Sequence, residues 1–563
     1  MKYKKWLNRS RHIKPTVILG LSFLFSPPAP AASVVPKPLL VEDTRQMAEL
    51  IESIHPDPYF FGGGKIAFHR RFQQLLGLID EPGMDINRYA CRLLPFLARI
   101  GDGHTYVIPP SWSADQRIGL PVQMRTIEGR ILISGIYGQQ NRSLLNCQLT
   151  RVEGISIDRL AEREKNILAC ENVYHNFRRL IDGLNRLPRL KLLVPEWKDY
   201  PTIKATFTDA NGESFQKIFN LADYSAAEEL ISNQSSVILP SVKKADFAYR
   251  FLDNHKKTVL LRIEDMQTYR ECHEHWRFYG NYYPTLAKKP YLRWHGREPM
   301  SDMDAVIDHL PSATECFTRL VREMKENKSK TLIIDLRRNP GGISNMTEIL
   351  MYFLYGRKAI VDIGSRDYQI RKHSELYYRH NKGEAFHPHN DRRAIPIGTN
   401  DYDFAQERRF YSKEKQSEKK KEVLKELNEM ASHMPTFERE YLTGKYEAWY
   451  TPEHVVVLSS ERTFSSAFWM LKCFKKAGAK VVGTPSGQAP NTFSDQSPYT
   501  LKNSGITLYL TCKKSFSFPE LPAGVDVMIP DYPLTYRKLK EYQFDPNGEV
   551  ILALEILKTD TQE

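Results

Sequence analysis

The chain has 563 residues, enough for several domains, and its 41% hydrophobic and 26% charged residues are typical of a globular protein. Six Lys and Arg within residues 1–14 contribute to the formal charge of +13, so the rest of the chain carries only about +7. That is a mildly basic surface, which argues against a nucleic-acid-binding protein. We therefore expect no nucleic-acid partner.

The N-terminus has the layout of a secretory signal peptide. The basic residues 1–14 precede a short apolar run, VILGLSFLF (17–25), and small residues follow in SPPAPAAS (26–33). The apolar run is too short to span a bilayer comfortably, so cleavage after about residue 31 or 32 is favoured over a retained membrane anchor. A signal peptide over residues 1–32 predicts export to the periplasm, the cell surface or the medium, with no stable membrane insertion after cleavage.

Residues 33–112 are predicted to form a helical segment. Apolar residues recur at helical spacing in LLVEDTRQMAELIESI (39–54), and HPDPY (55–59) ends that helix. The same spacing recurs at 68–79 and 86–100, and the segment closes with GDGHTYVI (101–108).

Residues 113–255 are predicted to form a small β-rich domain. LPVQMRTIEGRILISGIYG (120–138) is typical of two strands around a turn at Glu128 and Gly129. Further strand and turn signals occur in 147–160 and 202–219.

Residues 256–545 have a different pattern, in which strands alternate with helices. This alternation predicts a mostly parallel sheet covered by helices, and polar stretches near 270–310 and 360–450 are interpreted as insertions that could roof or flank a cleft. The last residues, 546–563, are assigned to a C-terminal tail. The predicted strands of the core are TVLLRIEDM (258–266), TLIIDLR (331–337), VVVLSS (455–460) and AKVVGT (479–484).

The sequence offers little support for a metal or a disulfide framework. The seven cysteines are widely spaced, odd in number and form no CxxC pair. Cys272-His273-Glu274-His275 and His387-Pro388-His389 contain metal-ligand residue types, but neither has tetrahedral ligand spacing and both lie in the predicted insertions. We interpret them as surface residues and expect no metal and no cofactor.

The segment TFSSAF (463–468) lies between a predicted buried strand and a predicted apolar helix. A serine at such a junction is commonly a helix N-cap. The alternative is a nucleophile at a helix N-terminus, where the free amides and the helix dipole favour developing negative charge.

Two other motifs could complete such a site. In DLRRNPGG (335–342), the Gly341-Gly342 pair lets the backbone approach a substrate oxygen, although Asn-Pro-Gly-Gly is also an ordinary turn. In GDGHT (101–105), His104 is a candidate base, although a lone histidine in a loop is more often structural.

Five stretches of the chain follow one another in a recognisable order. They are IESIHPDPYF (51–60), LARIGDGHTYV (97–107), TLIIDLRRNPGG (331–342), TFSSAF with AKVVGTPSGQAPN (463–468 and 479–491), and ELPAGVDVMIPD (520–531). In this order they resemble the C-terminal-processing (tail-specific) serine peptidases, and the resemblance covers about 40–110 and 255–535. It implies a ClpP/crotonase-like, mostly parallel core and a degenerate PDZ-like domain in the β-rich region.

The resemblance also implies site residues. One branch of this family uses a Ser-Lys dyad, but the window PSGQAPN (485–491) that would supply the lysine has none. The chain is more similar to the branch that includes the tricorn protease core and the retinoid-binding relatives of the eye. That likeness implies His104 as base, Ser465 as nucleophile with Ser466 as the next candidate, Glu520 as the downstream carboxylate, and amides of Gly341 or Gly342 and of Ser466 as the oxyanion hole.

The predicted function is therefore an exported serine endopeptidase that cleaves polypeptides through an acyl-enzyme on Ser465. With His104 as base, kcat/KM should rise with pH, with an apparent pKa of about 6–7.

The alternative function is that of an inactive protein on the same fold that binds an apolar ligand or a peptide. An α/β-hydrolase esterase is disfavoured because no GxSxG elbow surrounds these serines. The sequence indicates neither the cleavage preference nor the oligomeric state.

Overall fold

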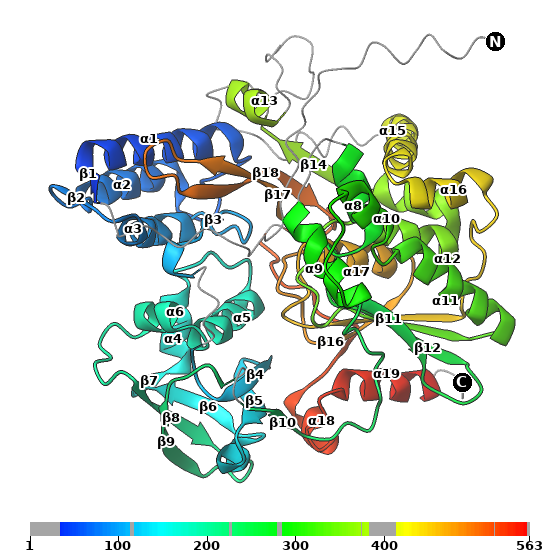
Figure 1. Cartoon of the computed structure of the whole chain (residues 1–563), viewed down its shortest axis with the longest axis horizontal. Coiled ribbons are helices and arrows are strands. Elements are labelled where there is room, and N and C mark those ends of the chain that lie inside the picture. Colours follow the sequence, from blue (N-terminus) through cyan, green and yellow to red (C-terminus); the bar gives the residue numbers. More distant parts are fainter. Residues whose placement is uncertain are drawn as a thin grey trace.

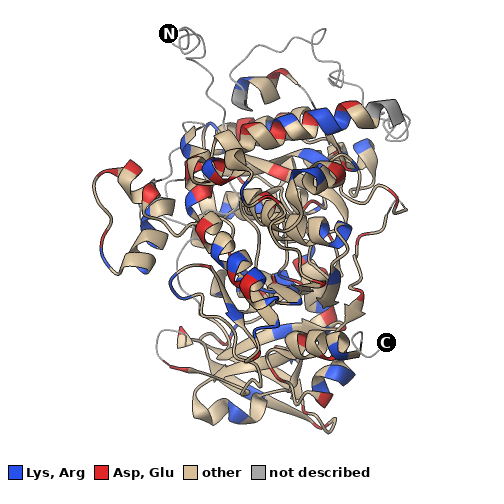
Figure 2. Ribbon diagram, turned by 90° about the vertical axis from the view of Figure 1, so that its right-hand side faces the viewer, with Lys and Arg blue, Asp and Glu red and all other residues tan. Residues whose placement is uncertain are grey.

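The computed structural model describes residues 34–112, 118–224, 228–278, 284–372, 374–381, 413–522 and 524–559 (Figure 1). The predicted signal peptide (1–32) and His387-Pro388-His389 lie outside the described residues. Among the described helices, none has both the length and the apolar character needed to cross a bilayer. Figure 2 shows basic and acidic residues intermixed along the ribbon.

The centre of the fold is a six-stranded sheet with strand order β11-β12-β13-β15-β16-β19. The five strands from β12 to β19 are parallel, and β11 joins the edge antiparallel to β12. This is the mostly parallel sheet that the alternation of strands and helices predicts. The strands are β11 (Phe247–Phe251), β12 (Thr258–Ile263), β13 (Thr331–Asp335), β15 (His454–Ser459), β16 (Lys480–Gly483) and β19 (Tyr532–Pro533).

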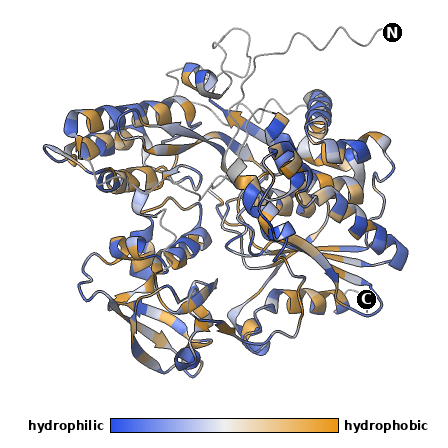
Figure 3. Ribbon diagram, in the orientation of Figure 1, coloured by the Kyte–Doolittle hydropathy of each residue, from blue (hydrophilic) through white to orange (hydrophobic). Residues whose placement is uncertain are grey.

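Both faces of this sheet are buried. Successive side chains of each strand point to opposite sides, and the side chains of each face belong to a separate hydrophobic cluster. In β12, Val259 and Leu261 belong to one hydrophobic cluster, whereas Leu260 between them belongs to another. Figure 3 shows hydrophobic residues along these strands and hydrophobic and hydrophilic residues alternating along the helices. The first face is covered by α8 (Arg270–Phe278), α11 (Ala313–Asn327), α12 (Asn345–Gly364) and α17 (Ser466–Lys476), and the second by α18 (Tyr536–Glu541) and α19 (Gly548–Thr559).

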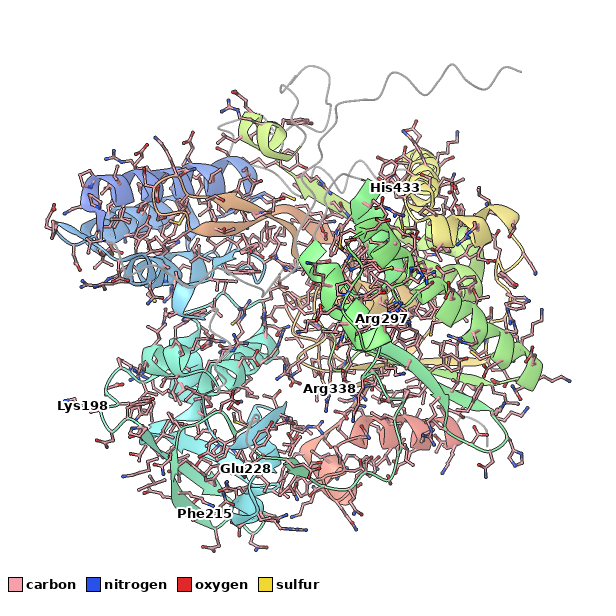
Figure 4. The ribbon with its side chains drawn as sticks, in the orientation of Figure 1. Lys198, Phe215, Glu228, Arg297, Arg338 and His433 are labelled. Atoms are coloured by element: carbon pink, nitrogen blue, oxygen red, sulfur yellow. The ribbon has the colours of Figure 1, made fainter. Side chains whose placement is uncertain are left out.

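Much of the two predicted insertions is helical, and part of it packs on the first face. The Cys-His-Glu-His run lies in α8, where Cys272, His273 and Glu274 are buried, so its interpretation as surface residues is wrong. The ring of His433, which is labelled in Figure 4, stacks on the ring of Phe278, the last residue of α8, with centroids 3.7 Å apart. The further helices are α9 (Pro284–His295), α10 (Met303–Asp308), α13 (Glu375–Asn381), α15 (Lys413–Ser432) and α16 (Pro435–Thr443).

The N-terminal region is helical, as expected, and a long hairpin ties it to the core. Strand β3 (Tyr106–Val107) pairs with β18, so residues that directly follow His104 join a sheet made from the end of the chain. At the hairpin tip, the amides of Asn503 and Ser504 donate to the carboxylate of Asp43. The elements are β1 (Val35–Pro36), α1 (Lys37–Ile54), α2 (Gly64–Gly77), β2 (Gly83–Met84), α3 (Ile86–Ala98) and η1 (Pro110–Trp112), with β14 (Tyr368–Arg371), β17 (Asn491–Thr500) and β18 (Thr507–Phe516) in the hairpin sheet.

The β-rich region is a seven-stranded sheet with three helices inserted between β7 and β8. Figure 1 shows it below α1–α3 and beside α18 and α19. Its elements are β4 (Val122–Ile127), β5 (Arg130–Tyr137), η2 (Gln139–Leu144), β6 (Gln148–Val152), β7 (Ile155–Ser156), α4 (Ile157–Glu164), α5 (Val173–Leu184), α6 (Leu187–Leu193), β8 (Thr202–Thr208), β9 (Ser214–Asn220) and β10 (Leu230–Ser232).

Two expected boundaries differ from the structure. The core sheet already includes β11, which starts at Phe247, whereas the expected core begins at residue 256. The last residues are not a tail, because α19 buries Val550 and Leu552 against the second face of the core sheet. The apolar pattern in this segment is short, and a short pattern does not distinguish a packed helix from an unstructured tail.

A buried ion-pair network joins α19 to the core and to the β-rich region. Glu549 is 2% exposed, and its carboxylate accepts hydrogen bonds from Arg337 in the DLRRNPGG segment, at 2.8 Å, and from Arg125 of β4. Arg337 also donates to Asp335 at 2.8 Å. The same carboxylate therefore connects the end of β13 with the β-rich region.

Removing this carboxylate should destabilise the fold strongly. Glu549→Ala removes the buried carboxylate that Arg125 and the buried Arg337 share, and we expect a loss of about 3–5 kcal/mol in the free energy of unfolding. Glu555→Ala, six residues further along α19 at an exposed pair with Lys538, should cost less than about 1 kcal/mol. Urea denaturation followed by circular dichroism compares the two variants, and equal losses would contradict this account.

Candidate active site

Ser465 occupies a strained turn between β15 and α17. Its backbone angles are φ 54° and ψ −122°, a conformation that residues with a side chain rarely adopt and that costs roughly 1–3 kcal/mol. Its side chain makes no capping hydrogen bond to the helix, and it is only partly buried. Ser465 is thus not a conventional N-cap, and the turn presents its hydroxyl at the helix N-terminus.

Ser466, the second candidate, has a hydroxyl that is already engaged. Its Oγ donates to the carbonyl of Gly342 at 2.6 Å, which ties the start of α17 to the glycine turn. The backbone amide of Ser466 lies in the first turn of α17, where no intrahelical acceptor exists. These contacts favour Ser465 as nucleophile and leave Ser466 to contribute its amide.

The two glycines pass directly beside the serine turn. A side chain on Gly341 would meet Cβ of Ser465 at 2.7 Å, and one on Gly342 would meet Met266, so only glycine fits at either position. The amide of Gly341 donates to Oδ1 of Asn339 at 2.8 Å and is therefore already engaged. Gly342 forms a parallel bridge with Met266, so its own N–H and C=O point away from that residue, and its C=O meets Ser466. Gly342 is the better oxyanion candidate.

His104 is held by the loop that contains it. Asp102 accepts the backbone N–H of His104 at 2.8 Å and the hydroxyl of Thr105 at 2.5 Å. The carboxylate oxygen that accepts from Thr105 also faces His55 of the IHPDP stretch, whose Nε2 lies 3.4 Å away. Two separate sequence motifs therefore meet at one buried aspartate, which fixes the backbone of the histidine loop.

The carboxylate that faces the His104 ring at the shorter distance is Glu171. Its Oε1 lies 3.4 Å from Nδ1 of His104, compared with 3.8 Å for Asp102. Glu171 is 5% exposed and directly precedes Asn172, which caps α5. The sequence interpretation missed Glu171, because ACEN (169–172) contains no motif and its contact with His104 arises only from the tertiary fold.

Charge and burial act in opposite directions on these groups. Burial disfavours the protonated His104 ring, but the nearby carboxylates of Glu171, Asp102 and Asp495 outweigh burial and raise the pKa of His104. Burial raises the pKa of Glu171, and His104 opposes that shift. The pKa of Asp102 falls to about 2 despite burial, because His55 and His104 favour its charged form. Asp102 is therefore ionised at neutral pH.

Glu520 is not placed beside His104. It is exposed, and the described carboxylates within ion-pair distance of the imidazole are Asp102 and Glu171 alone. It follows the end of β18, beyond the stretch of the hairpin that pairs with β3. The assignment of Glu520 as the downstream carboxylate therefore has no geometric support.

Phe464 joins the histidine to the serine turn. This residue directly precedes Ser465, and its ring stacks on the His104 ring with centroids 4.8 Å apart. Both ring nitrogens of His104 are buried without a hydrogen-bond partner, and the described residues provide no hydrogen bond to the Ser465 hydroxyl. Such hydrogen bonds are often long in enzymes without substrate and tighten when substrate binds. The segments that contain His104 and Ser465 are more than 350 residues apart in the sequence, and the ring contact brings them together in the fold.

The same side chains offer a possible cation site. Asp102, His104 and Glu171 each have one ligand atom within 4.8 Å of the others, and in the described part of the chain no other group of this kind occurs. Both oxygens of Asp102 already accept hydrogen bonds from its own loop, which reduces their capacity as ligands. The geometry fits an orienting carboxylate–histidine pair more directly than a metal centre.

Comparison with known proteins identifies one domain. The sequence model of peptidase family S41 matches residues 300–518. The chain carries a peptidase family S41 domain. A search of curated proteins finds no match. The S41 domain contains Ser465, Gly341 and Gly342, whereas His104 and Glu171 lie outside the matched segment.

Solved structures are similar to nearly the whole chain. The crystal structure of mature CPAF is 14% identical, with a TM-score of 0.50, and the match covers 92% of this chain and 98% of that chain. A complex of mature CPAF with lactacystin matches at 14% identity and a TM-score of 0.49, over 92% and 99%. The photosystem II D1 C-terminal processing protease matches at 11% identity and a TM-score of 0.37, over 89% and 94%. At such low identity the likeness to mature CPAF concerns the fold alone, and together with the observed sheet it confirms the predicted α/β fold class.

Proposed function

We propose that the protein is an exported serine endopeptidase in which Ser465 is the nucleophile, His104 the general base and Glu171 the orienting carboxylate. Because the S41 family is a peptidase family, we infer that the substrates are polypeptides. The observation that carries the proposal is the buried imidazole of His104, which faces Glu171 through Nδ1 and stacks on the residue before a strained serine. Export rests on the signal-peptide layout of residues 1–32.

The reaction follows from this arrangement. Nδ1 of His104 faces Glu171, so Nε2 is the atom left to take the proton of Ser465 as its Oγ attacks the substrate carbonyl carbon. The oxyanion is held by the amides of Gly342 and Ser466, each contributing roughly 3 kcal/mol to the transition state. The imidazolium then protonates the leaving amine, and water hydrolyses the acyl-enzyme by the same proton transfers. Glu171 stabilises the imidazolium and its orientation.

The pH dependence of this reaction is set by His104. Only the neutral ring accepts the serine proton, so kcat/KM should rise as the pH passes through the pKa of His104. Because Glu171, Asp102 and Asp495 raise that pKa, the midpoint should lie above the ordinary value of 6.5, on the alkaline side of the range expected from the sequence. We expect labelling of the wild type by a fluorophosphonate probe to follow the same rise, with or without EDTA.

Three outcomes would contradict the proposal. A midpoint well below 6.5 would contradict a histidine surrounded by carboxylates, and loss of labelling in EDTA would indicate a required metal. Absence of labelling at every pH, together with tight binding of an apolar ligand or a peptide, would favour the inactive binding protein instead.

A further inference from the structure

Gln488 contacts the backbone of the proposed nucleophile. It lies in the loop 484–490 between β16 and β17, and only 7% of its surface is exposed. Its Oε1 accepts the backbone N–H of Ser465. An N–H group can donate only to an oxygen here, so this contact also fixes which way the side-chain amide is turned.

This contact explains how the strained serine turn persists. At φ 54° and ψ −122°, Ser465 adopts a conformation that its surroundings must impose. Its hydroxyl makes no capping bond, so the helix does not hold it through the side chain. On the carbonyl side, the Ser465 C=O accepts the amide of Trp469 at 2.9 Å, as part of α17. Gln488 restrains the other side of the residue, where the chain enters from Phe464.

The neighbouring residue of the same loop contacts the carboxylate that faces His104. The amide of Ala489 donates to Oε2 of Glu171 at 3.1 Å. The loop is anchored once more by Asn172, whose side-chain amide donates to the carbonyl of Ser486 at 3.0 Å. Consecutive residues thus bind the nucleophile turn and the carboxylate, which limits how far these two can move apart.

We propose that Gln488 is the positioning residue of the active site: it holds Ser465 in its strained conformation and, through Ala489, keeps it in register with the Glu171–His104 pair. This inference rests on the proposed function, since it assigns a role toward the same nucleophile. Gln488 does not touch the reacting atoms. Its contribution is to the placement of Oγ, and displacement of a reacting atom by about 1 Å is enough to cost on the order of 100-fold in rate.

Two substitutions of similar size separate this role from simple packing. Gln488→Met keeps the length and burial of the side chain but removes the acceptor for the Ser465 N–H. Gln488→Glu keeps an oxygen acceptor whether or not the new carboxyl group is ionised. We expect Gln488→Met to lower kcat for a peptide substrate and the rate of fluorophosphonate labelling by about 10- to 100-fold, with KM changed by less than about threefold. Gln488→Glu should stay within about fivefold of the wild type.

Active-site titration and thermal unfolding of both variants distinguish the outcomes. A Gln488→Met protein that is folded, fully titratable and within threefold of wild-type kcat would overturn the proposal. So would a Gln488→Glu protein that loses as much activity as Gln488→Met, because that result would indicate a need for the exact side chain rather than for its acceptor. If the wild type itself fails to react with the probe, the proposed function fails, and this is visible before either variant is examined.

Discussion

Replacing Ser465 by alanine should remove covalent labelling by a fluorophosphonate and lower kcat for peptide hydrolysis by roughly 10⁴-fold or more. The reason is that no other described hydroxyl combines a strained backbone, a helix N-terminus and the adjacent Gly341-Gly342 turn. The protein should remain folded, because the Ser465 side chain makes no capping hydrogen bond. Mass spectrometry of the probe adduct, together with steady-state kinetics, measures both effects.

Ser466→Ala is the matched comparison. This substitution removes the hydrogen bond to the Gly342 carbonyl but keeps the backbone amide, so we expect a loss of about tenfold or less. If Ser466→Ala abolishes labelling while Ser465→Ala retains it, the nucleophile assignment is wrong. Each variant removes a single hydroxyl group from one of two adjacent serines, so the comparison identifies the nucleophile without altering the surrounding core.

Replacing Glu171 by glutamine should lower kcat by about 10²- to 10⁴-fold, the range expected when an active-site histidine loses its orienting carboxylate. Glutamine keeps the size of the side chain but removes the negative charge that faces Nδ1 of His104 at 3.4 Å. Because this charge raises the pKa of His104, the rise of kcat/KM with pH should move to lower pH in the variant. Measuring kcat/KM across the pH range tests both expectations at once.

Glu520→Gln is the control for this prediction. Glu520 is exposed and is not among the described ion-pair partners of His104, so its substitution should leave kcat within about twofold of the wild type. A large loss in Glu520→Gln with little change in Glu171→Gln would reverse the assignment and restore the carboxylate that the family resemblance implies.

The buried core was the part of the fold that could be predicted from sequence. Continuous apolar runs such as 331–335 and 455–459 have no polar face, which indicates strands covered on both sides, and they form β13 and β15 of the parallel sheet. The C-terminal helix α19 could not be predicted in the same way. Its Glu549 is bound by Arg337 and Arg125, which come from segments far away in the sequence.

The candidate site shows the same limit. His104, Ser465 and the two glycines lie in short motifs, and the resemblance of those motifs to a known family implied their roles. Glu171 and Gln488 act through contacts across the fold, and neither lies in a pattern that marks its role. Arg338 illustrates the difference within one motif: unlike the buried Arg337 beside it, its side chain is 68% exposed (Figure 4).

The most direct test of the account is a crystal structure of the protein with a peptide boronic acid, which forms a tetrahedral adduct with a serine nucleophile. We expect the boron on Oγ of Ser465, Nε2 of His104 within about 2.6–3.2 Å of that oxygen, and a boronate oxygen facing the amides of Gly342 and Ser466. An adduct on another residue, or an imidazole that stays against Phe464 and out of hydrogen-bonding reach of Ser465, would contradict the catalytic pairing on which the proposed function depends.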